Sequence, residues 1–168
     1  TLTTGGAENA ITVQGRYAYT VGSSQLRVID VSNPIAPFTV STTSIGGSSS
    51  QVIVQGRYAY LSLGTTFVVY DVSNPAVPLR VGGTTFASSV TKIASNGRYV
   101  YGASSTQLFA VDINNPTNPA VVSTTSLFSA SGIYGVVIQN RYLYVINDNT
   151  RLQIVDISNA ASPSVTST

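Results

Sequence analysis

The chain has 168 residues, enough for one domain with a sizeable core, and its net charge of +2 comes without any cluster of Lys and Arg, which excludes nucleic-acid binding. Cys, His, Met and Trp are all absent, and with them thiol nucleophiles, imidazole bases and the common zinc and copper ligands. We therefore expect a protein that is not an enzyme, holds no cofactor or metal, and has no membrane span, since no apolar run approaches roughly 18 residues.

The first predicted element is a hairpin near the N-terminus. An apolar run at residues 11–14 leads into a Gly turn, and residues 16–21 then place Tyr at alternate positions, which is typical of a strand. A third strand is predicted at residues 26–31. It ends in Ser-Asn-Pro, where Asn starts a turn and Pro removes a backbone donor. After Pro37, a Thr- and Ser-rich strand at residues 38–43 completes a unit of four short strands.

This unit recurs along the whole chain. The segment VQGRYAY at residues 13–19 returns unchanged at 54–60, and shorter copies stand at 96–101 and 140–144. The Arg of this motif recurs at intervals of 41, 41 and 43 residues, as Arg16, Arg57, Arg98 and Arg141. The Asp that closes the third strand recurs as Asp30, Asp71, Asp112 and Asp156. The sequence therefore predicts an all-β protein of four repeats, with approximate bounds 11–50, 51–91, 92–134 and 135–168.

Four-stranded repeats of about 42 residues are typical of a β-propeller, in which each four-stranded antiparallel sheet is one blade. The segments QLRVIDVSNP at residues 25–34 and RLQIVDISNA at 151–160, each behind an Arg-Tyr hairpin, resemble the LVIVD repeat of bacterial and archaeal surface and secreted proteins. The resemblance covers all four repeats. It implies a β-propeller fold and an extracellular or cell-surface location, and it is almost silent on activity. Ala160 stands where the other copies have Pro, which predicts a looser turn.

The sequence leaves the closure of the ring open. Propellers usually build one blade from both chain ends, so we expect residues 1–10 to complete the last blade. The four blades could then close on themselves, or form half of a larger ring shared by two copies. A third possibility is that the N-terminal strand completes a blade of the next copy, which builds a filament.

The recurring Arg and Asp residues are the first candidates for a functional site. They stand 14 or 15 residues apart in every repeat, as Arg16 and Asp30 do in the first. Residues placed identically in every copy serve what every copy has in common. We therefore expect these pairs to be structural, tying each hairpin to its turn, and not to form a ring of charged sites.

Positions that differ between the repeats are better candidates for binding. They fall in the loops ahead of each first strand and between the second and third strands, which we expect at one end of the propeller. The candidate binding residues are Glu8, Asn9, Gln51, Lys92, Tyr134, Asp148 and Arg151.

The sequence favours a non-enzymatic extracellular binding or display module whose variable loop face contacts a protein or a glycan. The alternative is a structural subunit of an extracellular filament or surface assembly, built by strand exchange between propellers. Low charge and hydroxyl-rich fourth strands, which tolerate close lateral packing, favour that alternative. Self-association as a dimer or a filament is compatible with the sequence.

Overall fold

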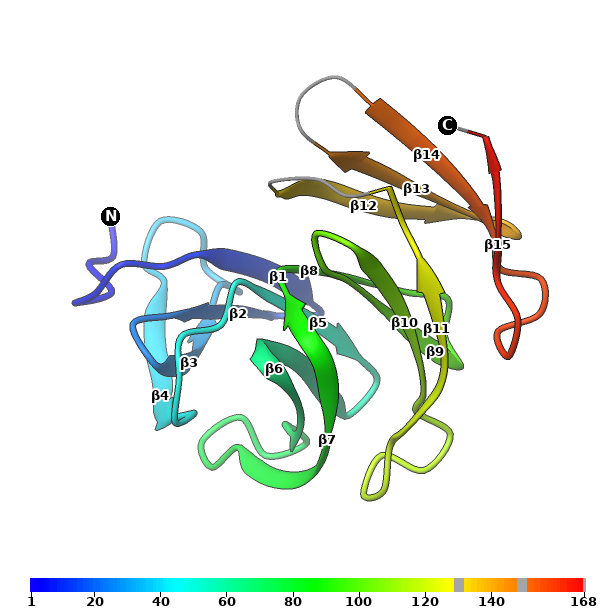
Figure 1. Ribbon diagram of the computed structural model, residues 1–168. Helices are drawn as coiled ribbons and strands as arrows, with labels where there is room; N and C mark the ends of the chain where they lie inside the picture. Colours follow the sequence, from blue (N-terminus) through cyan, green and yellow to red (C-terminus); the bar gives the residue numbers. More distant parts are fainter. Residues whose placement is uncertain (129–131, 148–150, 168) are drawn as a thin grey trace.

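The computed structural model describes residues 1–128, 132–147 and 151–167, and these residues form β-sheets joined by turns and loops (Figure 1). Within this part of the chain the strands make up four antiparallel sheets in chain order, one for each predicted repeat. We call them blades 1 to 4. Each strand pairs with the strand that follows it in its blade, so every blade is a simple meander. The described residues contain no helix that could cross a membrane.

The strands of the blades have the following bounds. Blade 1 contains β1 (Ala10–Gln14), β2 (Tyr17–Gly22), β3 (Gln25–Asp30) and β4 (Phe38–Ser44). Blade 2 contains β5 (Gln51–Gln55), β6 (Tyr58–Asp71) and β7 (Leu79–Val90). Blade 3 contains β8 (Lys92–Ser95), β9 (Tyr99–Ala103), β10 (Gln107–Asp112) and β11 (Ala120–Ser126). Blade 4 contains β12 (Ile133–Gln139), β13 (Tyr142–Asn147), β14 (Arg151–Asp156) and β15 (Ser164–Ser167).

Blade 2 holds its second and third strands in one long strand, β6. The first part of β6 pairs with β5 and the last part pairs with β7. Between the two parts, Gly64 has a φ of 67°, a left-handed conformation that Gly adopts without a steric penalty. The chain reverses there, and Val72 N donates to Arg57 O at 2.8 Å just as Val31 N donates to Arg16 O at 2.9 Å in blade 1. All blades thus share one four-stranded layout.

The hairpin turns explain why Gly in the motif is replaced by Asn in the last repeat. Gly15 and Gly56 both have a φ of 60°, and Asn140 has a φ of 57°. Asn is one of the few residues other than Gly that tolerates this conformation.

The turn after the third strand is the same in every repeat. The backbone N–H of Ala36 donates to the carbonyl of Asn33 at 3.1 Å, and that of Ser162 donates to Asn159 at 3.0 Å. The looser turn expected at Ala160 is therefore not observed. The Asn159 side chain also accepts from Ala161 N at 3.1 Å, so Asn holds the turn without the ring of a Pro.

The blades pack face to face in chain order. A hydrophobic cluster fills the space between blades 1 and 2, another lies between blades 2 and 3, and another between blades 3 and 4. Tyr19, Tyr60 and Tyr101, the second Tyr of the first three hairpins, are buried in these clusters. The contacts between blades, and not an interior within any single sheet, form the core.

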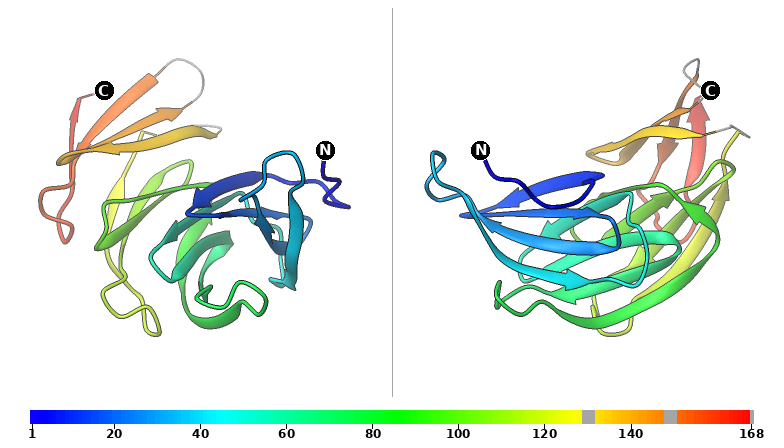
Figure 2. Two further views of the ribbon diagram at one scale, coloured as in Figure 1. Left: turned by 180° about the vertical axis from the view of Figure 1, so that it is seen from behind. Right: turned by 90° about the vertical axis from the view of Figure 1, so that its left-hand side faces the viewer.

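The blades form an open arc and not a closed ring (Figures 1 and 2). Their first strands, β1, β5, β8 and β12, are neighbours in that order, while blades 1 and 4 lie at opposite ends of the arc and the two termini are far apart. Of the forms of closure that the sequence left open, the self-closed ring of four blades is not adopted by this single chain.

Residues 1–10, which we expected to complete the last blade, lie on blade 1. Asn9 N donates to Val21 O at 2.8 Å, and the Ser23 hydroxyl donates to Ala7 O at 3.1 Å. The fourth strand of blade 4 is β15, which pairs with β14 of the same chain. Because the arc stays open, the N-terminal residues are too far from blade 4 to join it (Figure 1).

Candidate functional site

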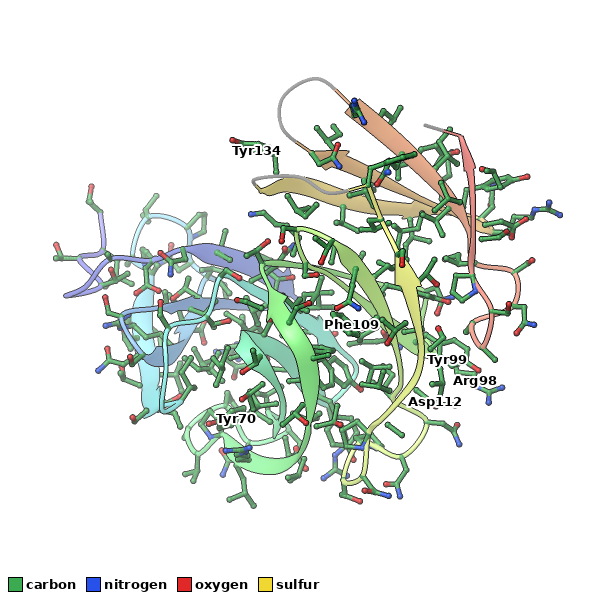
Figure 3. The ribbon with its side chains drawn as sticks, viewed as in Figure 1. Tyr70, Arg98, Tyr99, Phe109, Asp112 and Tyr134 are labelled. Atoms are coloured by element: carbon green, nitrogen blue, oxygen red, sulfur yellow. The ribbon has the colours of Figure 1, made fainter. Side chains whose placement is uncertain are left out.

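The recurring Arg and Asp side chains form an ion pair in every repeat. Arg16 pairs with Asp30 and Arg57 with Asp71. Arg98 Nη2 lies 3.2 Å from Asp112 Oδ2, and Arg141 Nη2 lies 2.9 Å from Asp156 Oδ2. Figure 3 labels Arg98 and Asp112 in blade 3. Each guanidinium also lies over the Tyr ring that follows it, at 5.0 Å from the ring centroid for Arg141 and Tyr142.

The second oxygen of each Asp holds the turn that follows. Asp30 Oδ1 accepts from Ser32 N at 2.9 Å, and Asp156 Oδ1 accepts from Ser158 N at 2.9 Å. Hydrogen bonds from Ser32 and then Arg16 lower the pKa of Asp30 to about 2, and those from Arg57 and then Ser73 lower the pKa of Asp71 to about 2. Such carboxylates are ionised at neutral pH and cannot serve as general acids.

The variable loops lie at the other end of the blades. The antiparallel register sets Ala10 opposite Val21 in blade 1 and Lys92 opposite Ala103 in blade 3. The start of each first strand is therefore beside the turn between the second and third strands, far from the Arg–Asp pairs.

Several candidate binding residues are used for contacts within the chain. Glu8 forms an ion pair with Arg27 of β3, and both side chains are largely buried. Asn9 Nδ2 donates to Ser49 O at 2.9 Å, and Gln51 Oε1 accepts from Ile93 N at 3.2 Å. Asn9 and Gln51 thus each join their blade to the next one.

Among the other candidates, Tyr134 and Arg151 are exposed and Lys92 is half-buried. Tyr134 is 59% exposed and projects from the start of β12 into open space (Figure 3). Lys92, at the start of neighbouring β8, has no ion-pair partner among the described residues. Asp148 lies outside the described residues.

Phe128 is a surface residue that the sequence analysis missed. Its ring is 45% exposed and lies 5.7 Å below the guanidinium carbon of Arg151. The signal was present in the sequence, because Gly46 and Ala87 occupy the corresponding positions of the first two repeats. We define the blade 3–4 rim as Lys92, Phe128, Tyr134 and Arg151.

The described residues bring few acidic or metal-ligating side chains together. Within the ranges that the structure describes, no three His, Cys, Asp or Glu side chains come close enough to hold a metal ion. Five of the six acidic residues are engaged in ion pairs with Arg, and the remaining one is Asp148.

Comparison with known families agrees with the repeat structure. The LVIVD repeat matches residues 5–43, 46–84, 87–126 and 134–168, which is most of the chain. The chain belongs to the LVIVD-repeat family. The resemblance seen in the sequence is thereby confirmed. A search of the curated proteins found no match.

Solved structures confirm that the LVIVD repeats form a β-propeller fold. PpgL, a periplasmic gluconolactonase of Pseudomonas aeruginosa, is 14% identical and superposes with a TM-score of 0.81 over 96% of this chain and 53% of its own. The computationally designed protein Ika4 is 9% identical, with a TM-score of 0.68 over 90% of this chain and 92% of its own. The computationally designed Ika8 is 8% identical, with a TM-score of 0.72 over 93% of this chain and 47% of its own. The LVIVD chain thus spans about half the length of PpgL and Ika8.

Proposed function

We propose that this LVIVD-repeat propeller is a non-enzymatic extracellular module that binds its partner at the blade 3–4 rim. The observation that carries the proposal is that the rim holds two exposed aromatic rings and two cations, at positions that the repeat itself does not require. Tyr and Arg are enriched at sites where proteins bind one another, because a rigid ring gives a large contact at low entropic cost and a guanidinium presents several hydrogen-bond donors in one plane.

The rim is specific to the last two blades. Arg151 stands where the other repeats have Gln25, Thr66 and Gln107, none of which carries a charge. When a partner covers an exposed Phe such as Phe128, apolar surface is removed from water, and this stabilises the complex. The cations of Lys92 and Arg151 favour a protein or glycan partner that carries carboxylates.

The engaged acidic residues support a role without catalysis. Glu8 and the Asp of each repeat are paired with Arg, so the described part of the chain offers no pair of free carboxylates for hydrolysis. The likeness to a gluconolactonase rests on 14% identity and concerns the fold alone. The charged fraction of 8% and the absence of Cys support a location outside the cell.

Strand exchange, the alternative function considered from the sequence, has less support. Every blade already takes its strands from its own chain, since β15 completes blade 4. Residues 7–9 are hydrogen-bonded to blade 1 and are not free to join another copy.

A binding assay with matched variants tests the proposed function. The probes are polyuronate oligosaccharides and Asp- and Glu-rich peptides, and the rim variant combines Lys92→Gln, Tyr134→Ala and Arg151→Gln. We expect this variant to lose binding and to keep the thermal unfolding midpoint, because Tyr134 is exposed and the Lys92 ammonium is unpaired. The control combines Arg80→Gln with Phe38→Ala, which removes an exposed Arg and an exposed ring away from the rim.

Two results would overturn the proposal. The first is that the rim variant binds the probes as well as the control does. The second is clear turnover of lactone or glycoside substrates by the unmodified chain.

A further inference from the structure

The two ends of the arc expose two different blade faces. Every blade has one face toward the preceding blade and one toward the following blade. In blade 1, the face toward the preceding blade has no blade of this chain against it (Figures 1 and 2). In blade 4, the face toward the following blade has none. We call the open face of blade 1 the entry face (Ile11, Val13, Ala18, Ile29 and Val31), and that of blade 4 the exit face (Val137, Tyr144, Ile146 and Leu152).

The exit face has the composition of a buried surface. By register, Leu152 corresponds to Leu26, Phe67 and Leu108, which are at most 1% exposed against the next blade, whereas Leu152 is 49% exposed. Ile146 stands beside Leu152 and is equally exposed, while its counterparts Val21 and Ala103 are fully buried. The exit face lines a groove of about 470 Å³ whose walls carry no charged side chain. Such a surface costs free energy while it faces water.

The entry face is its structural counterpart. Ile11 and Val13 are more than half exposed, whereas Val52, which corresponds to Ile11 in blade 2, is buried against blade 1. Ile11 and Val31 line a groove of about 460 Å³ with Ala18 and Ile29, which are already buried in the single chain. Residues of the N-terminal segment also border this groove.

The hydrogen bonds between blades leave a donor on blade 4 and an acceptor on blade 1. Gln14 Nε2 donates to Gly56 O at 2.6 Å, and Gln55 Nε2 donates to Gly97 O at 2.7 Å. Gln139 holds the same register position in β12, and its exposed side chain has no partner in the described ranges. On blade 1, the carbonyl of Gly15 corresponds to the acceptor carbonyls of Gly56 and Gly97.

The outer strands repeat this pattern. The Ser41 hydroxyl donates to Pro75 O of the next blade at 2.6 Å, and the Ser123 hydroxyl donates to Ala160 O at 2.6 Å. On blade 1, the carbonyl of Pro34 holds the position that corresponds to these acceptors.

We propose that the exit face of blade 4 docks onto the entry face of blade 1 of a second copy of this chain, so that two copies close one ring of eight blades. The contact repeats the packing that joins blades 1 to 4, with Gln139 donating to Gly15 O of the other copy. The arc already superposes on about half of two longer chains, which fits a half ring. A two-fold axis relates the two identical contacts. The proposal rests on the blade faces and not on the blade 3–4 rim, so it stands or falls separately from the proposed function.

The mass of the chain in solution, measured by light scattering and sedimentation over a wide concentration range, is the first test. We expect twice the chain mass of 17.5 kDa. Leu152→Glu and Val13→Glu each place a charge in the contact, and both residues are exposed in the single chain, so both variants should fold and remain monomeric. Val77→Glu, at an exposed apolar residue in a turn of blade 2, is the matched control and should remain dimeric.

Mixing the two monomeric variants tests which faces meet. A Leu152→Glu chain keeps an intact entry face, and a Val13→Glu chain keeps an intact exit face, so the mixture should form a dimer through one contact. If blade 4 met blade 4 instead, Val13→Glu would dimerise by itself.

The proposal is overturned by a wild-type chain that stays monomeric at every concentration, or by a dimer that tolerates either charge substitution. It is also overturned if the mixed variants fail to associate. Species larger than two chains would rule out the closed ring of eight blades.

Discussion

Gln14 of blade 1 donates a 2.6 Å hydrogen bond from Nε2 to the backbone carbonyl of Gly56, the hairpin turn of blade 2. Gln55 repeats this bond to Gly97 of blade 3 at 2.7 Å, and its Oε1 accepts from the Ser95 hydroxyl at 3.0 Å. The Gln of the VQGRYAY motif thus connects one repeat to the next. The hydrophobic clusters supply the area of contact, and these bonds fix the positions of β1, β5 and β8 relative to one another.

Replacing Gln55 with Ala should lower the free energy of unfolding by about 1–2 kcal/mol, because two hydrogen bonds between blades are lost. Urea denaturation monitored by circular dichroism measures this change. The control is Gln139→Ala in the Leu152→Glu background, where the exposed Gln139 side chain has no partner and the loss should be below about 0.5 kcal/mol. Equal losses at the two positions would contradict the role of Gln55 between blades.

Phe109 should be one of the most sensitive core positions. Its ring is buried between blades 2 and 3, with its centroid 5.0 Å from that of Phe86. Phe109→Ala leaves a cavity there, and we expect the free energy of unfolding to fall by about 3–5 kcal/mol. Phe38→Ala removes the same atoms from an exposed site on β4 and should change stability by less than about 0.5 kcal/mol. A loss at Phe109 no larger than that at Phe38 would show that the cluster is not packed as described.

Gly82 marks a close approach between two blades. A Cβ atom at this position of β7 would lie 2.2 Å from the carbonyl oxygen of Pro116 in blade 3. Gly82→Ala should therefore force the blades apart and lower stability by about 1–3 kcal/mol. Gly47→Ala is the control, since its Cβ would meet its nearest neighbour at an ordinary 3.9 Å. The thermal unfolding midpoints of the two variants give the comparison, and matching midpoints would argue against the close approach.

Acid should destabilise the fold through the Asp carboxylates. The folded-state pKa values of Asp30 and Asp71 are about 2, below the ordinary value of 3.8, so the ionised form is favoured by folding. Their contribution is fully present above about pH 4 and is lost as the pH falls toward about 2. We expect the unfolding midpoint to drop across this window, and the double variant Asp30→Asn, Asp71→Asn to show a shallower drop. Identical profiles would mean that other groups control acid unfolding.

The sequence by itself determined the repeat and the contacts within it. Once the hairpin and third strand of a repeat are assigned, antiparallel pairing sets Tyr17 opposite Asp30, which brings the neighbouring Arg16 within reach of that carboxylate. The spacing of 14 residues is enough to predict this pair because the strands between the two residues are regular and short. Strand order, the all-β class and the family follow from the same local pattern.

Only the tertiary structure decided how the blades are arranged and which loop residues are free. The angle between blades depends on the packing of side chains from neighbouring blades, such as Phe86 and Phe109. A local sequence pattern does not show how these side chains pack together along the arc. For the same reason Asn9 and Gln51 looked available for binding, although each reaches the next blade. Contacts within a repeat are fixed by chain connectivity, whereas contacts between repeats depend on the packing of surfaces that are distant in sequence.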